Sequence, residues 1–281
     1  VMRPTWHFVT PADIRWMLEL TGPRVNALSG TYYRQVGLDE ATMLRSNEII
    51  AKQLEGGRFL TRAELGMALK AAGIAVDGLR LGFLMGRAEL DAVICSGPRQ
   101  GKQFTYALLA ERAPQAKSLA REEALAELTR RYFTSHGPAT LRDFAWWSGL
   151  TLTDAKAGLA MVGSQLSHEE SDGQDYWFAA SLPTAIPADS VFLLPTFDEF
   201  LVGFSSFDQA RRNGGDLTFE STIVSNGQVI GSWKRSLKRE NVLIELAPFA
   251  RLSSDQTQAV NAAALRYGQF VGKSVENVYL N

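Results

Sequence analysis

The chain has 281 residues, of which 46% are hydrophobic, so it can bury several modest cores, and two or three domains are expected. No apolar run reaches the length of a membrane span, and one cysteine, Cys95, excludes an internal disulfide, so we expect a cytoplasmic protein without a membrane or disulfide partner. The histidines His7, His136 and His168 lack the spacing of metal ligands, and neither a metal nor a cofactor is expected.

The N-terminal segment predicts a strand followed by a helix. Thr5–Val9 has the character of a strand, and Asp13 caps a helix over Ile14–Leu20. A first strand with no helices before it resembles the last strand of a domain whose helices lie upstream. We therefore expect residues 1–30 to end such a domain and the natural protein to begin further upstream.

Residues 31–115 are predicted to form a three-helix domain with a hairpin. The expected elements are a helix over Asp39–Leu54, a helix capped by Thr61 and Glu64, a turn at Gly73 and Ile74, a third helix from Asp77, and strands Ala92–Cys95 and Phe104–Ala107.

Residues 116–185 repeat the same order more clearly. The expected elements are a helix over Arg121–Phe133, a helix capped by Thr140 and Asp143, a tight turn at Ser148–Leu150, a third helix capped by Thr151 or Thr153, and a hairpin around Asp172 and Gly173. Helices joined by a tight turn and followed by a hairpin indicate a winged helix, with the hairpin as the wing. Winged helices bind nucleic acid, but they also serve as protein interaction modules.

The last part, residues 186–281, is predicted to be a separate α+β module. An apolar run at Val191–Leu194 precedes three strands, Leu217–Val224, Val229–Lys234 and Val242–Leu246, with a hairpin turn at Asn226-Gly227, and Ser253 with Gln256 caps a final helix. Asp198 and Glu199 suggest an acid–base pair, but neighbours in a strand point to opposite faces, so a site from these two alone is not expected. The predicted fold class is α+β, mostly helical, with tandem winged-helix domains followed by a module with a β-meander.

Because the formal net charge is −1, binding to DNA would require the basic residues to gather on one surface, apart from the acidic ones. The predicted third helix and wing of the first copy gather the basic residues Arg80, Arg87, Arg99 and Lys102. The second wing gathers the acidic residues Glu169, Glu170, Asp172 and Asp175. The first wing is therefore the better phosphate contact, and the second copy either faces away from DNA or serves the structure.

Two aromatic features and one histidine have structural interpretations beside functional ones. Trp146 and Trp147 follow Phe144 at helical spacing, so at least one ring is expected in the core, and the other could stack on a base. His136 precedes Gly137 and a proline and is interpreted as a turn residue rather than a catalyst.

Four segments resemble the winged-helix alkylpurine DNA glycosylases of the AlkZ and YcaQ type. Met2–Val9 with Asp13 resembles the Met-Arg-Gly-Thr-x-His-x-Val segment of that family, with a proline where the family has glycine. The others are Gly137–Leu150, Leu194–Gly203 and Gly227–Trp233, in the family's order over nearly the whole chain.

The resemblance implies a C-shaped protein of tandem winged helices around a cleft for double-stranded DNA, which removes alkylated purines. In the family, a Gln-x-Gln or Gln-x-Asp motif holds a water against the anomeric carbon, and that motif precedes the Met-Arg-Gly-Thr segment. It would fall upstream of Val1, so no catalytic residue is carried over, and Gln256-Thr257-Gln258 is interpreted as helix surface. Arg3 and His7 border the expected position of the motif, and Arg99 with Lys102 is the candidate phosphate clamp.

Two other functions stay open from the sequence. A non-catalytic regulator would prefer particular undamaged DNA sequences and bind as a dimer at two half-sites. A protein interaction scaffold would ignore nucleic acid altogether.

Overall fold

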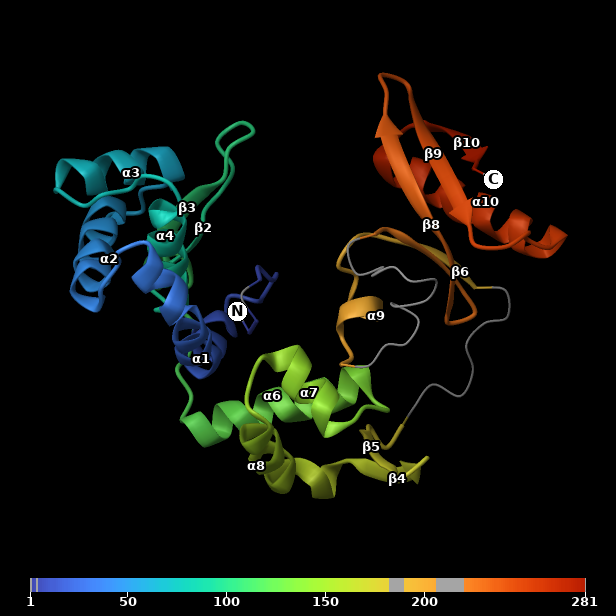
Figure 1. Cartoon of the computed structure of the whole chain (residues 1–281), viewed down its shortest axis with the longest axis horizontal. Helices are drawn as coiled ribbons and strands as arrows, with labels where there is room; N and C mark the ends of the chain where they lie inside the picture. Colours follow the sequence, from blue (N-terminus) through green and yellow to red (C-terminus); the bar gives the residue numbers. More distant parts are fainter. Residues whose placement is uncertain (1, 4, 182–189, 206–219, 281) are drawn as a thin grey trace.

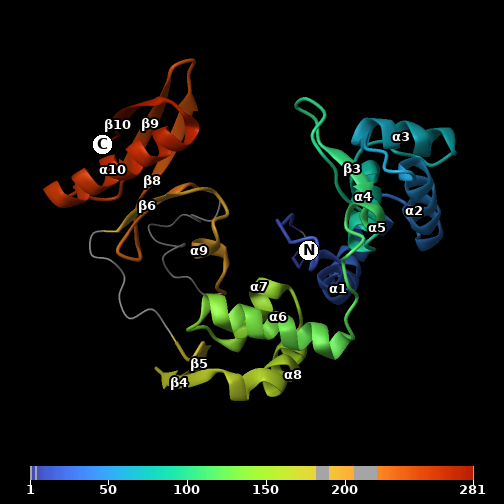
Figure 2. The same cartoon turned by 180° about the vertical axis from the view of Figure 1, so that it is seen from behind.

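The computed structural model describes residues 2–3, 5–181, 190–205 and 220–280. Two helical units and one sheet unit follow each other around an open C, and the N-terminal segment lies inside the curve (Figures 1 and 2). In this described part of the chain, no helix is long and apolar enough to cross a membrane.

The first helical unit has the element order expected for residues 31–115. Its elements are α2 (Glu40–Leu54), β1 (Leu60–Thr61), α3 (Arg62–Ala71), α4 (Arg80–Leu90), β2 (Ile94–Ser96), β3 (Thr105–Leu108) and α5 (Leu109–Arg112). The capping box of Thr61 and Glu64 is confirmed, and strand order β1-β3-β2 closes a small antiparallel sheet. Met43, Ile50, Leu65 and Leu84 are among the residues that fill its core.

The second helical unit repeats this order. Its elements are α6 (Arg121–His136), α7 (Leu141–Ser148), α8 (Leu152–Val162), the 3₁₀ turn η1 (Gly163–Gln165), β4 (Ser167–Ser171) and β5 (Gln174–Phe178). The capping box of Thr140 and Asp143 is confirmed, and Thr151 rather than Thr153 caps α8. A bridge between Ala139 and Trp177 takes the place that β1 has in the first unit.

Helix α1 (Ile14–Gln35) is much longer than the helix expected over Ile14–Leu20. The helix continues through Gly22 and Pro23, which follow the expected range. A Cβ at Gly22 would lie 2.5 Å from the carbonyl oxygen of Leu90, so glycine lets α1 approach the end of α4 closely. Trp16 and Leu20 enter the core of the second unit, and Tyr33 enters that of the first, which makes α1 a shared element.

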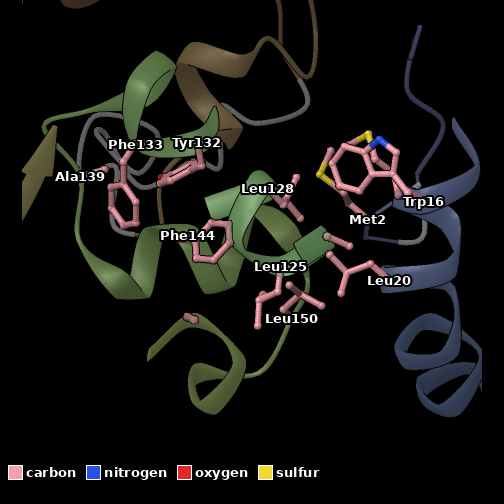
Figure 3. Packing of buried hydrophobic residues seen from close by; sticks show 13 residues of the cluster. Met2, Trp16, Leu20, Leu125, Leu128, Tyr132, Phe133, Ala139, Phe144 and Leu150 are labelled. Carbon is pink, nitrogen blue, oxygen red and sulfur yellow. The ribbon is translucent and has the colours of Figure 1, made fainter. Parts of the chain in front are cut away.

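The strand expected at Thr5–Val9 is wrong, because this segment pairs with no other strand. It has no regular secondary structure, with Trp6 and Phe8 exposed and His7 and Val9 partly buried, and such an alternation is the pattern of a strand. Tertiary contacts hold the start of the segment instead. Met2 is buried beside Trp16 of α1, facing α6 (Figure 3), and its backbone N–H donates to Thr21.

The C-terminal unit contains a five-stranded sheet in the order β10-β9-β8-β7-β6. Its strands are β6 (Val191–Leu194), β7 (Thr222–Ser225), β8 (Gln228–Leu237), β9 (Asn241–Pro248) and β10 (Ser274–Tyr279), and α10 (Ser254–Val271) packs on it. The Asn226-Gly227 turn and the Ser253–Gln256 capping box are confirmed. The sequence does not predict β10, which pairs in parallel with β9 after the α10 crossover, and Leu217 lies outside the described residues.

Asp198 and Glu199 do not lie in a strand, so the strand geometry assumed for them is wrong. Asp198 caps the short helix α9 (Glu199–Val202), and its carboxylate accepts a hydrogen bond from the backbone N–H of Phe200. A left-handed residue, Phe197 with φ 59°, turns the chain out of β6 and into this helix.

The predicted domain boundaries stay predictions. Helix α1 runs without interruption through residues 30 and 31, where the first boundary is predicted.

Candidate functional site

The tip of the β2–β3 hairpin presents the predicted clamp to solvent. Gly101, with φ 61°, takes the first central position of a two-residue turn closed by the bridge between Gln100 and Gln103. Arg99 lies over the exposed ring of Phe104, 4.4 Å from its centroid, and Lys102 is exposed. Both cations are therefore available to a ligand beyond the hairpin tip.

Arg80 and Arg87 already have partners within the first unit. Arg87 donates to both oxygens of Glu40 and to Asp91, and its side chain is only 13% exposed. The hydrogen bonds to Glu40, above all, raise the pKa of Arg87. Arg80 donates to the carbonyl oxygen of Val36 and pairs with Asp77. The charges of Arg80 and Arg87 are therefore paired inside the unit, whereas Arg99 and Lys102 at the hairpin tip are exposed.

A second basic hairpin, β8–β9, was not identified from the sequence. It rises opposite the β2–β3 hairpin, and the two tips project to the same side of the molecule (Figures 1 and 2). Exposed cations lie on strand β8, at Lys234 and Arg235, and in the turn that follows it, at Lys238 and Arg239, where Glu240 is also exposed. The sequence contains this pattern, but the strand expected to end at Lys234 extends to Leu237, so the hairpin is longer than predicted.

The acidic hairpin β4–β5 lies at the opposite side of the molecule from these two tips (Figures 1 and 2). Glu169, Glu170, Asp172 and Asp175 are exposed on it. Acidic and basic side chains are thus segregated among the hairpins.

Helix α9 is fixed to the second unit by polar contacts at its C-terminal end. The carbonyl oxygen of Val202 accepts from the guanidinium of Arg3 at 3.0 Å and from the indole of Trp146 at 3.1 Å. The hydroxyl of Tyr132 donates to the carbonyl oxygen of Gly203. Asp143, the capping-box partner of Thr140 in α7, accepts from Ser205 at the same junction.

At the other end of α9, Glu199 meets two aromatic side chains of the second unit. Its Oε1 accepts from the indole N–H of Trp147 and lies 3.2 Å from Nε2 of His136. The His136 ring stacks on Tyr132 at 4.8 Å. The hydrogen bond from His136, more than that from Trp147, holds the pKa of Glu199 below its usual range.

Arg3 and His7 lie beside this cluster, on the N-terminal segment. The guanidinium of Arg3 is 5.6 Å from the centroid of the Trp146 ring, and Trp146 is about half exposed. Arg3 Nε and His7 Nδ1 are buried without a hydrogen-bond partner in the described residues. Burial lowers the pKa of His7, which favours its neutral form near pH 7.

The structure brings together segments that are far apart in the sequence. Met2–Val9, Gly137–Leu150 and Leu194–Gly203, three of the segments that carry the resemblance, meet at α9. The fourth, Gly227–Trp233, joins them where Val229 packs against Leu201. Neither His136, interpreted as a turn residue, nor Glu199 was predicted to belong to a site, because their proximity depends on the tertiary fold.

A pocket of about 500 Å³ lies elsewhere, between α1 and α6. The charged groups of Asp13, Glu127, Arg130 and Arg131 in its lining bond to each other. We therefore do not place the functional site there. Among the described residues, no group of three or more histidine, cysteine or carboxylate side chains could hold a metal ion.

Comparison with known proteins gives the family. A family model described as DNA glycosylase AlkZ-like matches residues 1–270. The chain belongs to this family. The resemblance inferred from the sequence is thus confirmed, and the family match supports a glycosylase of DNA repair rather than a transcriptional regulator.

The fold is also that of a solved structure. Streptomyces sahachiroi DNA glycosylase AlkZ aligns with a TM-score of 0.77 and 22% identity, over 99% of this chain and 80% of that one. This likeness confirms the mixed α+β fold class with its C-terminal sheet unit. No curated protein sequence matches the chain.

Proposed function

We propose that this family member excises N7-alkylated purines from double-stranded DNA. The observation that carries the proposal is how two basic hairpins are arranged within the family fold. Two exposed basic hairpins project on either side of the junction at which the segments of the resemblance meet (Figure 1). An N7-alkylated purine is already cationic and leaves readily, so positioning and modest electrostatic stabilisation suffice for its excision.

In this proposal, the hairpin tips hold the DNA backbone. Arg99 and Lys102 contact phosphates from one side, and the β8–β9 tip does so from the other. Arg3 and His7 lie close to the damaged nucleotide, at the junction with α9. Arg80 and Arg87 support the first unit through their internal ion pairs. The acidic β4–β5 hairpin faces away from the DNA.

We also infer a cytoplasmic location, because the proposed substrate is genomic DNA and the sequence contains a single cysteine.

The test is release of the base from defined duplexes. We expect the full-length natural protein, with the segment expected upstream of Val1, to release N7-methylguanine from a duplex that carries one such base, to leave an abasic site, and to leave the matched undamaged duplex intact. Chromatography of the released base and alkaline cleavage of the strand measure the two products. Binding to duplex DNA without any base release would contradict the proposal.

A further inference from the structure

The carboxylate of Glu199 is held at one oxygen and open at the other. Oε1 accepts from Trp147 and His136, whereas Oε2 has no hydrogen-bond partner among the described residues. The Glu199 side chain is 47% exposed, while that of His136 is only 16% exposed. The donors are therefore packed into the protein, and the carboxylate that they orient can reach a ligand.

The charge of Glu199 is maintained and is not paired with the nearby arginine. Hydrogen bonding to His136 and Trp147 lowers the pKa of Glu199, so the carboxylate is ionised at neutral pH. Arg3 donates to the carbonyl oxygen of Val202 instead, and no ion pair within 4 Å joins Arg3 to Glu199 among the described residues. An ionised, oriented and open carboxylate stabilises positive charge that develops beside it.

We propose that Glu199 stabilises the positive charge on the deoxyribose as the purine leaves, and that His136 and Trp147 are positioning residues for its carboxylate. This inference rests on the proposed function and deepens it. It adds a charge-stabilising group from α9, to which neither the sequence nor the comparisons assign a role.

The step balances with water as the only reactant besides the DNA. The bond between C1′ and the purine N9 breaks, and its electron pair moves to the base, which becomes neutral. The positive charge then lies on C1′ and the ring oxygen of the sugar, opposite the Glu199 carboxylate. A water oxygen bonds to C1′, and the proton of that water passes to bulk solvent.

The competing role for Glu199 is to fix α9 to the second unit. Glu199→Gln separates the two roles, because the amide oxygen still accepts from His136 and Trp147 while the negative charge is removed. Tyr132→Phe is the matched control, since it removes a hydrogen bond to the carbonyl oxygen of Gly203 and leaves the Glu199 charge in place. Thermal unfolding of both variants shows whether the junction is intact.

The experiment compares binding of two abasic-site analogues in the same duplex, a cationic pyrrolidine and a neutral tetrahydrofuran. We expect the unmodified protein and Tyr132→Phe to prefer the cationic analogue by about tenfold, and Glu199→Gln to lose this preference while its affinity for tetrahydrofuran is retained. We also expect the single-turnover release of N7-methylguanine to slow roughly tenfold or more in Glu199→Gln alone.

The outcomes separate this inference from the proposed function. If the unmodified protein releases N7-methylguanine but Glu199→Gln retains the same rate and analogue preference, the proposed function stands and the role of Glu199 is overturned. If no base is released but the preference for the cationic analogue depends on Glu199, the role of the carboxylate is supported and the proposed activity is contradicted. Equal loss of both affinities in Glu199→Gln, with a lowered unfolding temperature, would assign Glu199 to the junction alone and overturn the inference.

Discussion

A single carboxylate, that of Asp13, joins the start of α1 to α6. It accepts hydrogen bonds from Arg131 at 2.8 Å, from Thr10 at 2.7 Å and from the indole of Trp16 at 3.0 Å. The hydrogen bond from Arg131, the largest favourable contribution, lowers the pKa of Asp13 to about 2. The folded state therefore favours the ionised carboxylate over the protonated one.

We expect Asp13→Asn to lower the free energy of unfolding at pH 7 by about 1–2 kcal/mol, a figure reduced from the full pKa linkage because Arg131 is 42% exposed. A lowered carboxyl pKa stabilises the fold above its unfolded value near 4, and this contribution is lost as the pH falls toward 2. Urea unfolding at several pH values should thus show the two proteins converging below pH 4.

Asp172→Asn, on the exposed turn between β4 and β5, is the control for the change in net charge. A constant difference between Asp13→Asn and the unmodified protein from pH 7 down to pH 2 would contradict the ion-pair explanation.

At the scale of elements, the β2–β3 hairpin is basic and the β4–β5 hairpin is acidic, and the effect of this difference on DNA binding can be tested directly. We expect Arg99→Ala with Lys102→Ala to weaken binding to duplex DNA and to reduce the slope of log affinity against log salt by about 2, since each phosphate contact contributes about 0.9. Fluorescence anisotropy over a salt series measures both quantities. Because Arg99 and Lys102 lie at an exposed tip, stability should be unchanged.

The matched control neutralises the acidic hairpin instead. Glu169→Gln with Glu170→Gln should leave the salt slope unchanged, because β4–β5 lies at the other side of the molecule (Figure 2). An unchanged slope in the Arg99 and Lys102 variant would remove these residues from the proposed DNA contact.

Local patterns predict many elements of this fold, because their causes lie within a few residues. The capping boxes at Thr61, Thr140 and Ser253 and the Asn226-Gly227 turn all occur where the sequence places them. Elements that depend on distant partners were missed or misassigned. β10 forms only because β9 offers an edge after the α10 crossover, and the segment Thr5–Val9 pairs with no such edge.

In the candidate site, too, local features were predicted and features that depend on distant contacts were not. The exposed pair Arg99 and Lys102 was predicted, since a basic turn between two strands is a local feature. The cluster of Glu199, His136 and Trp147 was not, because it forms only when α9 docks on α6 and α7.

At the scale of the whole molecule, α1 links the two helical units, since it contributes to the cores of both. Its close approach to α4 requires Gly22, because an added Cβ would meet the backbone oxygen of Leu90. We expect Gly22→Ala to destabilise the protein by about 1–3 kcal/mol, and to weaken DNA binding because the first unit shifts relative to the second. Chemical unfolding and duplex affinity measure the two effects.

Gly30→Ala on the same helix is the control. A Cβ at Gly30 meets only the side chain of Arg34 at 3.5 Å, so alanine should stabilise the helix by about 0.5–1 kcal/mol. If both alanine variants were equally stable, Gly22 would not determine the packing of α1 on α4.

The positions of the three hairpins also affect how the protein meets a polyanion. Their opposite charges give the molecule an electric dipole that its total of −1 conceals. The field of an approaching double helix exerts a torque on such a dipole and turns the basic tips forward before contact. Productive encounters thus become more frequent at low ionic strength, and this kinetic advantage requires no excess of positive charge.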